Sequence, residues 1–398
     1  MKLTRYKLGE ILELQRGYDL PSSQMKKGDI LVAGSNGVIG YHNEARSNHP
    51  CITVGRSGSV GKVHYYEQAT WAHNTALFVK DFKGNDPKYL YYFLKNLHLD
   101  KMFDKGSSVV PSLDRKVVHS LNVPCHKDID CQKRIAAILS KIDRKIELNC
   151  AINQNLEAMA KQLYDYWFVQ FDFPNEEGKP YKSSGGKMVW NEKLKREIPE
   201  GWDISLIKDI ATTYSGGTPK STNIEYYDNG EIAWINSGEL NSPIITKTTN
   251  YITKCGLENS SAKLYPSNSI LVAMYGATAG KVSLLTFEAC SNQAVCGVIP
   301  TIENMLYYVY FHISSLYSHF ITLSTGSARD NISQDTIKNI LLPIPTRNIL
   351  KLFDEKIGSI YQTIVNNYQQ IDSLTKQRDE LLPLLMNGQV SVNSDLSD

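Results

Sequence analysis

Two stretches decide the fold of this chain: CITVGRSGSVGKV at residues 51–63 and ILVAMYGATAGKV at residues 270–282. Each begins with a short run rich in β-branched and other apolar residues, continues through a turn of small residues, and ends in Gly-Lys-Val. Their first residues lie 219 positions apart in a chain of 398. A match at about half the chain length predicts two copies of one structural unit.

The match continues in the same order along both halves. His73-Asn74-Thr75-Ala76-Leu77 corresponds to Ser291-Asn292-Gln293-Ala294-Val295. Further matches are the aromatic helices expected at 87–103 and 304–320, the turns Gly106-Ser107-Ser108 and Gly326-Ser327-Ala328, and the proline-ended strands at 120–124 and 339–343. Each half closes with a long heptad-patterned segment. Six ordered matches predict a duplicated chain.

We therefore expect two globular domains of the α/β (α+β) class, each followed by a long helix. Short apolar runs bounded by Gly, Ser and Asn indicate strands, and Asp86 with Pro87 is typical of a helix start. The segment between the copies is rich in Pro, Gly, Ser and charge, as in a linker. The expected boundaries are 1–127 and 202–346 for the domains, 128–170 and 347–388 for the helices, 171–201 for the linker and 389–398 for a tail.

The two long segments repeat their apolar residues every seven positions, which indicates a coiled coil. In the first segment one expected seam position takes Ile135, Ile142, Asn149, Leu156 and Leu163, and the other takes Ile138, Lys145, Ile152, Met159 and Tyr166. The natural partner of each helix is the other helix. About 40 residues would extend roughly 60 Å. We expect Gly388 to end the second helix, and Pro383 to kink or shorten it.

Asn149 and Asn367 each lie near the middle of their helix. An antiparallel pair of helices brings the two middles into one layer, and a buried Asn in such a layer sets the register. We predict that Asn149 faces Asn367. Contact of either residue with solvent or with another protein is the alternative.

Composition and motifs narrow the function. The chain is 42% hydrophobic and 21% charged, which excludes wholesale disorder. The N-terminus MKLTRYKLGE lacks the apolar run of a signal peptide and no long apolar run follows, so we expect a cytoplasmic protein. The seven cysteines form no C-x-x-C pair, which favours free thiols over disulfides or a zinc site.

Catalytic patterns are missing from the sequence. It has no N-P-P-[YF] or D-P-P-Y of adenine methyltransferases, no nuclease pattern, no Walker motif and no H-E-x-x-H. The glycines at 34, 37, 40, 55, 58 and 61 form G-x-x-G-x-x-G runs, which favour turns over a phosphate cradle. We expect a binding and scaffolding protein and no metal site. An enzyme in its own right is the alternative, and an activity assay of the isolated chain separates the two.

Four further motifs accompany the repeat: LYDYWFVQF at 163–171, IPEGW at 198–202, SGGTP at 215–219 and WINSGEL at 234–240. Together with the half-chain repeat, they resemble the specificity subunits of type I restriction-modification systems. The resemblance covers essentially the whole chain.

This resemblance implies that each domain is a target recognition domain that reads one half of a bipartite, asymmetric site in double-stranded DNA. The helices would set the spacer and dock two adenine-methylating modification subunits, to which two restriction subunits add. The subunit itself would have no catalysis and no cofactor, because S-adenosylmethionine, ATP and Mg belong to the partner subunits. It implies no membrane partner. The alternative is a specificity chain of a related bipartite-site assembly with fused catalytic subunits, which gene neighbours would distinguish.

The charge is uneven between the copies. The chain carries +2 overall, but residues 1–127 carry +7 and residues 173–346 carry −2. Phosphate contact is therefore expected first of all from domain one. Aromatic residues at helical spacing, as at 89–93 and 307–311, favour core packing over base stacking.

The expected DNA contacts lie in polar, Gly-rich loops, since Arg can pair with guanine and Asn with adenine. An ordinary surface loop is the alternative for each residue. In domain one the candidates are Arg16, Ser35, Asn36, Arg56, Ser57, Ser59, Lys62, His73, Asn74, Ser107 and Ser108. In domain two they are Ser215, Thr218, Lys220, Asn236, Ser237, Tyr275, Lys281, Ser327, Arg329 and Asn331.

Overall fold

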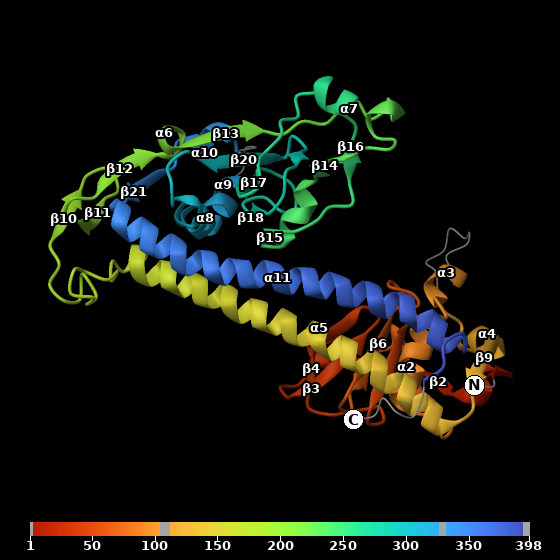
Figure 1. The fold of residues 1–398 in the computed structure, drawn as a ribbon. Coiled ribbons are helices and arrows are strands. Elements are labelled where there is room, and N and C mark those ends of the chain that lie inside the picture. The colour runs from red at the N-terminus through yellow and green to blue at the C-terminus, as the bar shows by residue number, and fades with distance from the viewer. Residues whose placement is uncertain (1–2, 104–111, 326–331, 393–398) are drawn as a thin grey trace. The chain divides into compact units, whose positions relative to one another are not determined.

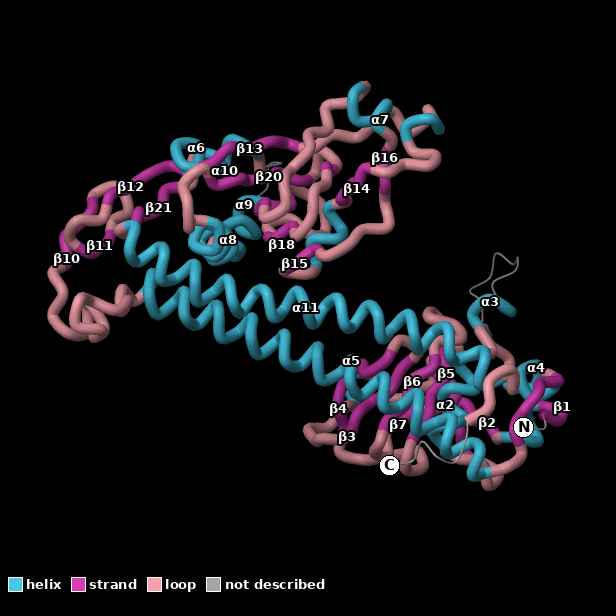
Figure 2. Tube along the Cα trace, viewed as in Figure 1, coloured by secondary structure: helices cyan, strands magenta, loops and turns pink. Residues whose placement is uncertain are grey.

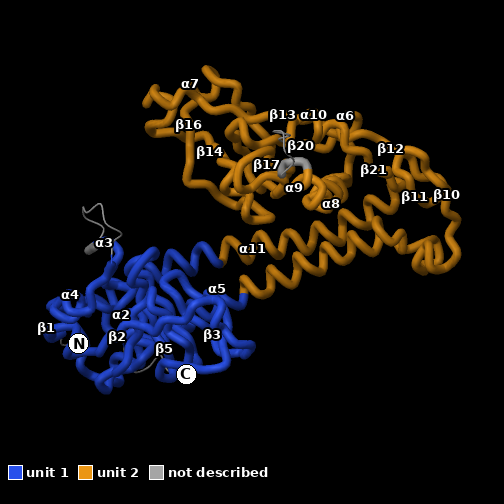
Figure 3. The backbone as a smooth tube through the Cα atoms, turned by 180° about the vertical axis from the view of Figure 1, so that it is seen from behind, with its two compact units in different colours: residues 1–148, 371–398 blue, residues 149–370 orange. Residues whose placement is uncertain are grey.

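The computed structural model describes residues 3–103, 112–325 and 332–392, and the chain divides into two compact units (Figure 3). Unit 1 comprises residues 1–148 and 371–398, and unit 2 comprises residues 149–370. Each unit holds one globular domain together with part of both long helices (Figure 1). The helices therefore contribute to the packing of both units.

Domain one is a mixed α/β domain, as expected (Figure 2). Its elements are β1 (Leu3–Lys7), α1 (Leu8–Ile11), β2 (Glu13–Arg16), β3 (Ile30–Gly34), β4 (Gly37–His42), β5 (Cys51–Gly55), β6 (Val63–Tyr66), β7 (Trp71–Ala72), β8 (Ala76–Asp81), α2 (Pro87–Asn96), α3 (Leu99–Phe103), α4 (Arg115–Ser120) and β9 (Asn122–His126). The strands form an antiparallel sheet in the order β2-β8-β5-β6, a second sheet β4-β3-β7 and the pair β1-β9.

Domain two repeats this order of elements and adds a short strand, β15 (Ile244–Ile245), and a short helix, α7 (Lys254–Glu258), before its equivalent of β5. Its elements are β12 (Asp203–Leu206), α6 (Ile207–Ile210), β13 (Ala211–Ser215), β14 (Ile232–Ile235), β15, β16 (Tyr251–Ile252), α7, β17 (Ser269–Ala273), β18 (Val282–Leu285), β19 (Cys290–Ser291), β20 (Val295–Pro300), α8 (Leu306–Ser315), α9 (Tyr317–Thr325), α10 (Gln334–Lys338) and β21 (Leu341–Ile344). The sheets β13-β20-β17-β18-β15, β16-β14-β19 and β12-β21 correspond to those of domain one.

The two stretches that revealed the repeat form central strands. All five residues of β5 are buried, and so are all five residues of β17, because each strand lies inside its sheet with side chains covered on both faces. A strand buried on both faces has a continuous apolar run instead of an alternating one. This explains why both stretches begin with consecutive apolar residues.

The aromatic helices are shorter than expected. The side chain of Asp86 accepts a hydrogen bond from the backbone N–H of Tyr89, and Pro87 is the first helical residue, as predicted. Helix α2 ends at Asn96, and His98 adopts φ 47° before α3 begins. Tyr89 and Phe93 are buried in the core, which confirms the core interpretation of these aromatic residues.

The expected linker 171–201 contains packed structure. Strands β10 (Met188–Asn191) and β11 (Arg196–Pro199) form an antiparallel hairpin. Phe171 and Phe173 are buried, and both rings contact Trp202 at the start of domain two. The composition of the segment predicted a linker, but the segment packs against domain two through these buried aromatic rings.

The long helices are α5 (Ile129–Tyr164), which continues into a π-helical turn at Asp165–Val169, and α11 (Arg347–Met386). They run antiparallel in both units. Asp143 pairs with Arg378 in unit 1, and Asn153 bonds to Asn367 in unit 2. Pro383 lies inside the last turns of α11 without ending it, and Gly388, at φ 66°, follows the helix end as predicted.

On α5 the expected seam is correct in its first position, and in its second position it is wrong except at Ile138, which is partly buried. Lys145, Ile152, Met159 and Tyr166 are exposed. The buried residues are instead Leu139, Asn153, Ala160 and Trp167, which follow the first seam position by four residues and not by three. Heptad spacing permits either choice, and the packing of the helices against the domains decides between them.

The predicted pairing of Asn149 with Asn367 is displaced along the helix. The amide nitrogen of Asn149 donates to Gln370 Oε1 at 3.3 Å, and that of Asn367 donates to Asn153 Oδ1 at 2.8 Å. Asn153 also reaches the backbone carbonyl of Ile364 at 3.4 Å. The middle of the helix pair thus holds a layer of four amide side chains, in which Asn149 and Asn153 are buried.

Candidate nucleic-acid interface

In domain one, the loop after β2 is fastened to the turn between β7 and β8. The backbone N–H of Gly17 donates to Ala76 and that of Tyr18 donates to Ala72. A Cβ atom on Gly17 would lie 2.1 Å from the carbonyl oxygen of His73, so only glycine fits there. The indole N–H of Trp71 completes the attachment by donating to the Tyr18 carbonyl at 3.3 Å.

Thr75, in the same turn as His73, joins two further loops to this point. Its side-chain oxygen accepts from the backbone N–H of Ser35 at 3.3 Å and contacts the His73 ring nitrogen Nδ1 at 3.0 Å. Its carbonyl accepts from the N–H groups of Arg56 and Ser57 at 2.8 and 3.1 Å. Four of the candidate residues are therefore neighbours in space although they lie far apart in the sequence.

Exposed polar side chains surround this centre. The ammonium of Lys62 donates to Asn36 Oδ1 at 2.8 Å. Asp19 accepts from the Asn74 amide and lies 3.9 Å from the Arg16 guanidinium. The candidates of domain one among the described residues thus form one polar surface.

Arg56 lies in a sharp turn, which also contains Ser57, Ser59 and three glycines. Gly58 and Gly61 adopt φ 81° and 77°, and a Cβ atom on Gly55 would lie 1.9 Å from the carbonyl of Ser59. These positions bear out the turn interpretation of the glycine pattern. Ser107 and Ser108 lie outside the described residues. Leu113, in the described segment that begins at residue 112, contacts this turn, since its backbone N–H donates to the Arg56 carbonyl at 2.8 Å.

Domain two has the same crowded glycine. A Cβ atom on Gly216 would lie 2.1 Å from the carbonyl of Asn292, and the Gly216 N–H donates to Val295 at 2.9 Å. The next N–H, of Gly217, donates to Ser291 at 2.8 Å. These bonds place Asn292 where domain one has His73. The sequence match, which set Ser291 opposite His73, was therefore wrong by one residue.

The indole N–H of a tryptophan fastens this loop too, but from another strand. Trp234 of β14 donates to the Gly217 carbonyl at 3.0 Å, whereas Trp71 of domain one belongs to β7. The strand of domain two that corresponds to β7 carries Cys290 instead. Different strands thus supply the same donor to the same backbone position.

Two side-chain hydrogen bonds of domain one recur with other residues. Thr218, at the position of Asp19, donates to Gln293, at the position of Asn74. Lys281 donates to Asn241, as Lys62 donates to Asn36. The loops have the same framework, with different groups presented on it.

The other candidates of domain two surround the same turn. The hydroxyl of Tyr275 donates to the Gln293 carbonyl at 2.7 Å, and the Asn292 amide donates to Asn236 Oδ1 at 3.3 Å. The carbonyl of Ser237 accepts from Thr278 at 2.9 Å, and the hydroxyl of Ser215 donates to Gln334 at 3.0 Å. Lys220 is exposed. Ser327, Arg329 and Asn331 lie outside the described residues.

Sequence reasoning missed three residues of this surface in domain one. Asp19 connects Arg16 to Asn74, and Thr75 connects the loops, but neither was a candidate. Arg46 was missed as well, although its guanidinium lies over the ring of Tyr18. The repeat offered one signal, because Thr75 lies inside a matched stretch.

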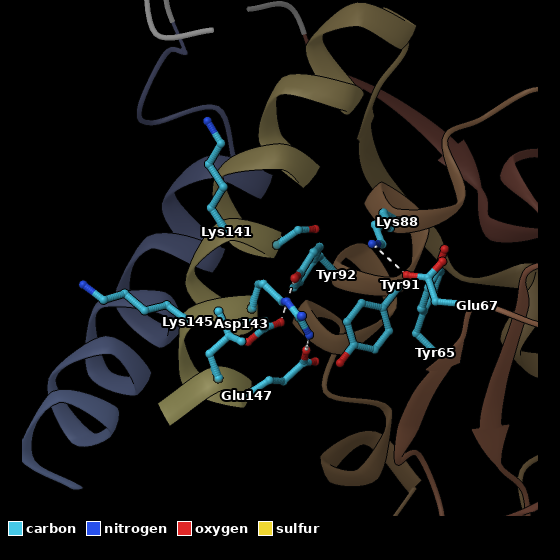
Figure 4. Close-up of a pocket in the computed structure, with 12 residues that line it drawn as sticks. Tyr65, Glu67, Lys88, Tyr91, Tyr92, Lys141, Asp143, Lys145 and Glu147 are labelled. Carbon is cyan, nitrogen blue, oxygen red and sulfur yellow. Dashed lines mark hydrogen bonds and ion pairs between the residues drawn. The ribbon is translucent and has the colours of Figure 1, made fainter. Parts of the chain in front are cut away.

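A groove of about 690 Å³ separates domain one from helix α5 (Figure 4). Its charged residues are largely paired. Lys88 lies 2.9 Å from Glu67, Arg144 lies 3.3 Å from Glu147, and the hydroxyl of Tyr92 donates to Asp143 at 2.7 Å. Its paired charges belong to the contact between domain one and helix α5, and we assign the groove no ligand.

Two buried cysteines, Cys290 and Cys296, lie in strands β19 and β20 of domain two. Burial raises the pKa of the Cys290 and Cys296 thiols to about 12, so neither is a ready thiolate. Within residues 3–103, 112–325 and 332–392, no cluster of three or more His, Cys, Asp or Glu could hold a metal ion. In the same part of the chain, no helix is long and apolar enough to cross a membrane.

Comparison with known proteins agrees with this architecture. The family model described as "Type I restriction modification DNA specificity domain" matches residues 2–158 and again residues 199–381. The MjaIX specificity subunit of Methanocaldococcus jannaschii is 27% identical over 77% of this chain and 69% of its own length. The EcoR124I/EcoR124II specificity subunit of Escherichia coli is 25% identical over 94% of this chain and 88% of its own.

A solved structure has the same fold. The S subunit of a type I restriction-modification system from M. genitalium superposes with a TM-score of 0.63 at 15% identity, over 97% of this chain and 96% of that one. The two family matches correspond to the two copies of the repeat. The chain therefore belongs to the type I restriction-modification DNA specificity family.

Proposed function

We propose that the chain is the DNA-recognition subunit of a type I restriction-modification complex, with each domain reading one half of a bipartite site. The observation that carries the proposal is the duplicated loop surface. Gly17 and Gly216 are crowded by equivalent carbonyls, and the surrounding loops present different side chains. A shared framework with different polar groups suits two unlike half-sites, as an asymmetric target requires.

The charges support unequal roles. Domain one, with +7, supplies most of the phosphate attraction, which does not depend on sequence. Domain two, with a slightly negative charge, reads bases on a duplex that domain one and the partner subunits already hold. The isolated chain then binds DNA weakly, mainly through domain one, and tight binding requires its partners.

The test is a methylation map of cells with and without the gene. Loss of one bipartite N6-methyladenine motif is expected and supplies the target sequence. If every motif persists, the proposal is wrong. Grafting the loops of domain one from a relative should change only one half of the motif, which tests the assignment of one half-site to each domain.

The partners we propose are two adenine methyltransferase subunits, with two restriction subunits in the full complex. These partners hold S-adenosylmethionine, ATP and Mg, and this chain contributes no cofactor and no catalysis. Purified alone, it should transfer no methyl group and cleave no DNA. Activity of the isolated chain would instead favour an enzyme, and neighbouring genes that encode fused nuclease-methylases would favour the related assembly.

The exposed stripe on α5 is the docking surface that we propose for a methyltransferase subunit in unit 2. Ile152, Met159 and Tyr166 are 44%, 54% and 37% exposed and recur every seven residues along one face. Met159 and Tyr166 also line a pocket of about 560 Å³, together with Ile360 of α11. Contiguous exposed apolar side chains of this kind mark protein interfaces.

This docking surface can be tested by substitution. Ile152→Ser with Met159→Ser should release the methyltransferase subunit from the purified complex, because apolar contact area is lost. The control is Gln154→Ser, since Gln154 is exposed on the same helix but outside the stripe. Equal retention of the partner by both variants would place the docking surface elsewhere.

A further inference from the structure

Arg46 lies in the loop between β4 and β5, which the sequence patterns did not single out. Its guanidinium lies 5.1 Å from the ring centroid of Trp71 and 5.7 Å from that of Tyr18. The rings of Trp71 and Tyr18 contact each other edge to face, with centroids 6.3 Å apart. Both residues belong to the attachment that fastens the loop after β2, so Arg46 lies at the edge of the candidate interface.

The guanidinium is held in one orientation. Its Nε donates to Glu44 Oε1 at 2.9 Å, and the backbone N–H of Arg46 donates to the Thr70 carbonyl at 2.8 Å. A guanidinium over aromatic faces is attracted by their π electrons and loses little freedom on binding. Among the described residues no acceptor bonds to its two terminal nitrogens, and the side chain is 47% exposed.

We propose that Arg46 reads a guanine in the half-site bound by domain one, an inference that rests on the proposed function. Two free, parallel N–H donors match O6 and N7 of guanine in the major groove. The neighbouring Glu44 favours a base over a phosphate, because a carboxylate beside the guanidinium repels phosphate oxygens. A carboxylate can also accept from cytosine N4, so the pair suits one G·C base pair.

Arg46→Gln and Arg46→Lys, expressed with the partner subunits, test this role. Mapping N6-methyladenine should show a motif that is degenerate at one G·C position of one half-site, with about tenfold lower discrimination there. Arg46→Lys keeps the charge but loses the planar fork, so it should relax the same position. Melting of each purified complex reports whether the variant folds, and the lysine variant keeps the test valid if the glutamine variant does not.

The control is Arg196→Gln. Arg196 lies over the Phe171 ring at 5.1 Å in the hairpin of unit 2, so it has the same aromatic contact away from the loops. It should leave the motif unchanged. The salt dependence of binding to a duplex with the mapped motif gives the second readout, because loss of one phosphate contact lowers the slope of log K against log salt by about 0.9.

An unchanged slope with one degenerate position supports the proposal. A shallower slope with an intact motif assigns Arg46 to a phosphate, and no change in either leaves it a packing residue; both outcomes overturn the proposal. These results differ from failure of the proposed function, in which the unsubstituted chain itself would direct no bipartite motif.

Discussion

The two domains have the same framework but differ in what they place on it. A Cβ atom added to Gly17 or to Gly216 would lie 2.1 Å from an equivalent carbonyl oxygen, and an indole N–H donates to the backbone of both loops. Yet the position of Arg56, whose N–H donates to Thr75, is taken in domain two by Met274, whose N–H donates to Ala294 at 2.8 Å. The sequence match had set Tyr275, one residue later, opposite Arg56. Backbone geometry is thus kept, while the side chains carried at equivalent positions differ, and Met274 is buried where Arg56 is not.

The helices show a second contrast. In unit 1, Asp143 accepts from Arg378 at 2.8 Å and from Tyr92. Counted from the start of each long helix, the place of Asp143 is taken in unit 2 by Tyr361, whose ring contacts Tyr310 and Phe311. One unit is joined through a charged pair and the other through edge-to-face ring contacts, so the two should respond differently to acid and to substitution.

Acid should produce the largest difference. Burial, with the positive charge of Arg196, lowers the pKa of His312 to about 4, although a hydrogen bond to the Leu341 carbonyl opposes the shift. A lowered pKa means that the unfolded state binds more protons between about pH 6.5 and 4. The contribution of His312 to the free energy of unfolding is therefore fully present above pH 6.5. Roughly 3 kcal/mol of it is lost as the pH falls through that window.

The corresponding position of α2 in domain one is Phe93, which does not titrate. Hydrogen exchange along a pH series should show unit 2 opening as the pH falls toward 4. His312→Phe should flatten this dependence, even though it costs about 1 kcal/mol at neutral pH through lost hydrogen bonds. An unchanged pH profile in the variant would show that His312 is not responsible.

Arg378→Ala should destabilise unit 1 by about 3 kcal/mol. The Arg378 and Asp143 side chains are only 18% and 20% exposed, so the substitution leaves a largely buried carboxylate without its positively charged partner, although the hydrogen bond from Tyr92 remains. The midpoint of urea unfolding of unit 1 is the measurement. Combining Arg378→Met with Asp143→Leu should recover most of the loss, and a double variant as unstable as the single one would contradict the pairing.

Gly17→Ala and Gly216→Ala should each cost roughly 2–3 kcal/mol in their own domain, because the added Cβ forces two backbone segments apart. Gly238→Ala is the control, since a Cβ there meets nothing within 4 Å. Protection of each domain in hydrogen exchange measures the effect. Tolerance of alanine in only one domain would break the equivalence of the two frameworks.

Arg56→Ala should relax reading of one half-site by about 1–3 kcal/mol while the fold is kept. Met274→Ala should instead lower the stability of domain two and leave half-site reading unchanged, because Met274 is buried and its loss affects packing. Competition binding with altered half-sites separates the two outcomes. If Arg56→Ala leaves specificity intact, the guanidinium does not reach a base.

Much of the fold could be predicted because the sequence contains the same structural unit twice. The matched stretches at 51–63 and 270–282, the helix start at Asp86 and the helix end near Gly388 follow local rules that the structure obeys. The seam at Ile152 and Met159 could not be settled locally, because a seven-residue repeat does not say which neighbouring position is buried. The segment 171–201 shows the same limit, since its composition conceals the rings that bury it.

By itself the sequence determined the duplication, the α/β class of the domains, the antiparallel helices and the residue types available for binding. Only the tertiary structure decided which of them meet. Thr75 joins the loops at 35 and 56, and Arg46 reaches the rings of Tyr18 and Trp71, through contacts between residues distant in the chain. Such contacts depend on strand pairing and side-chain packing, which no local pattern encodes.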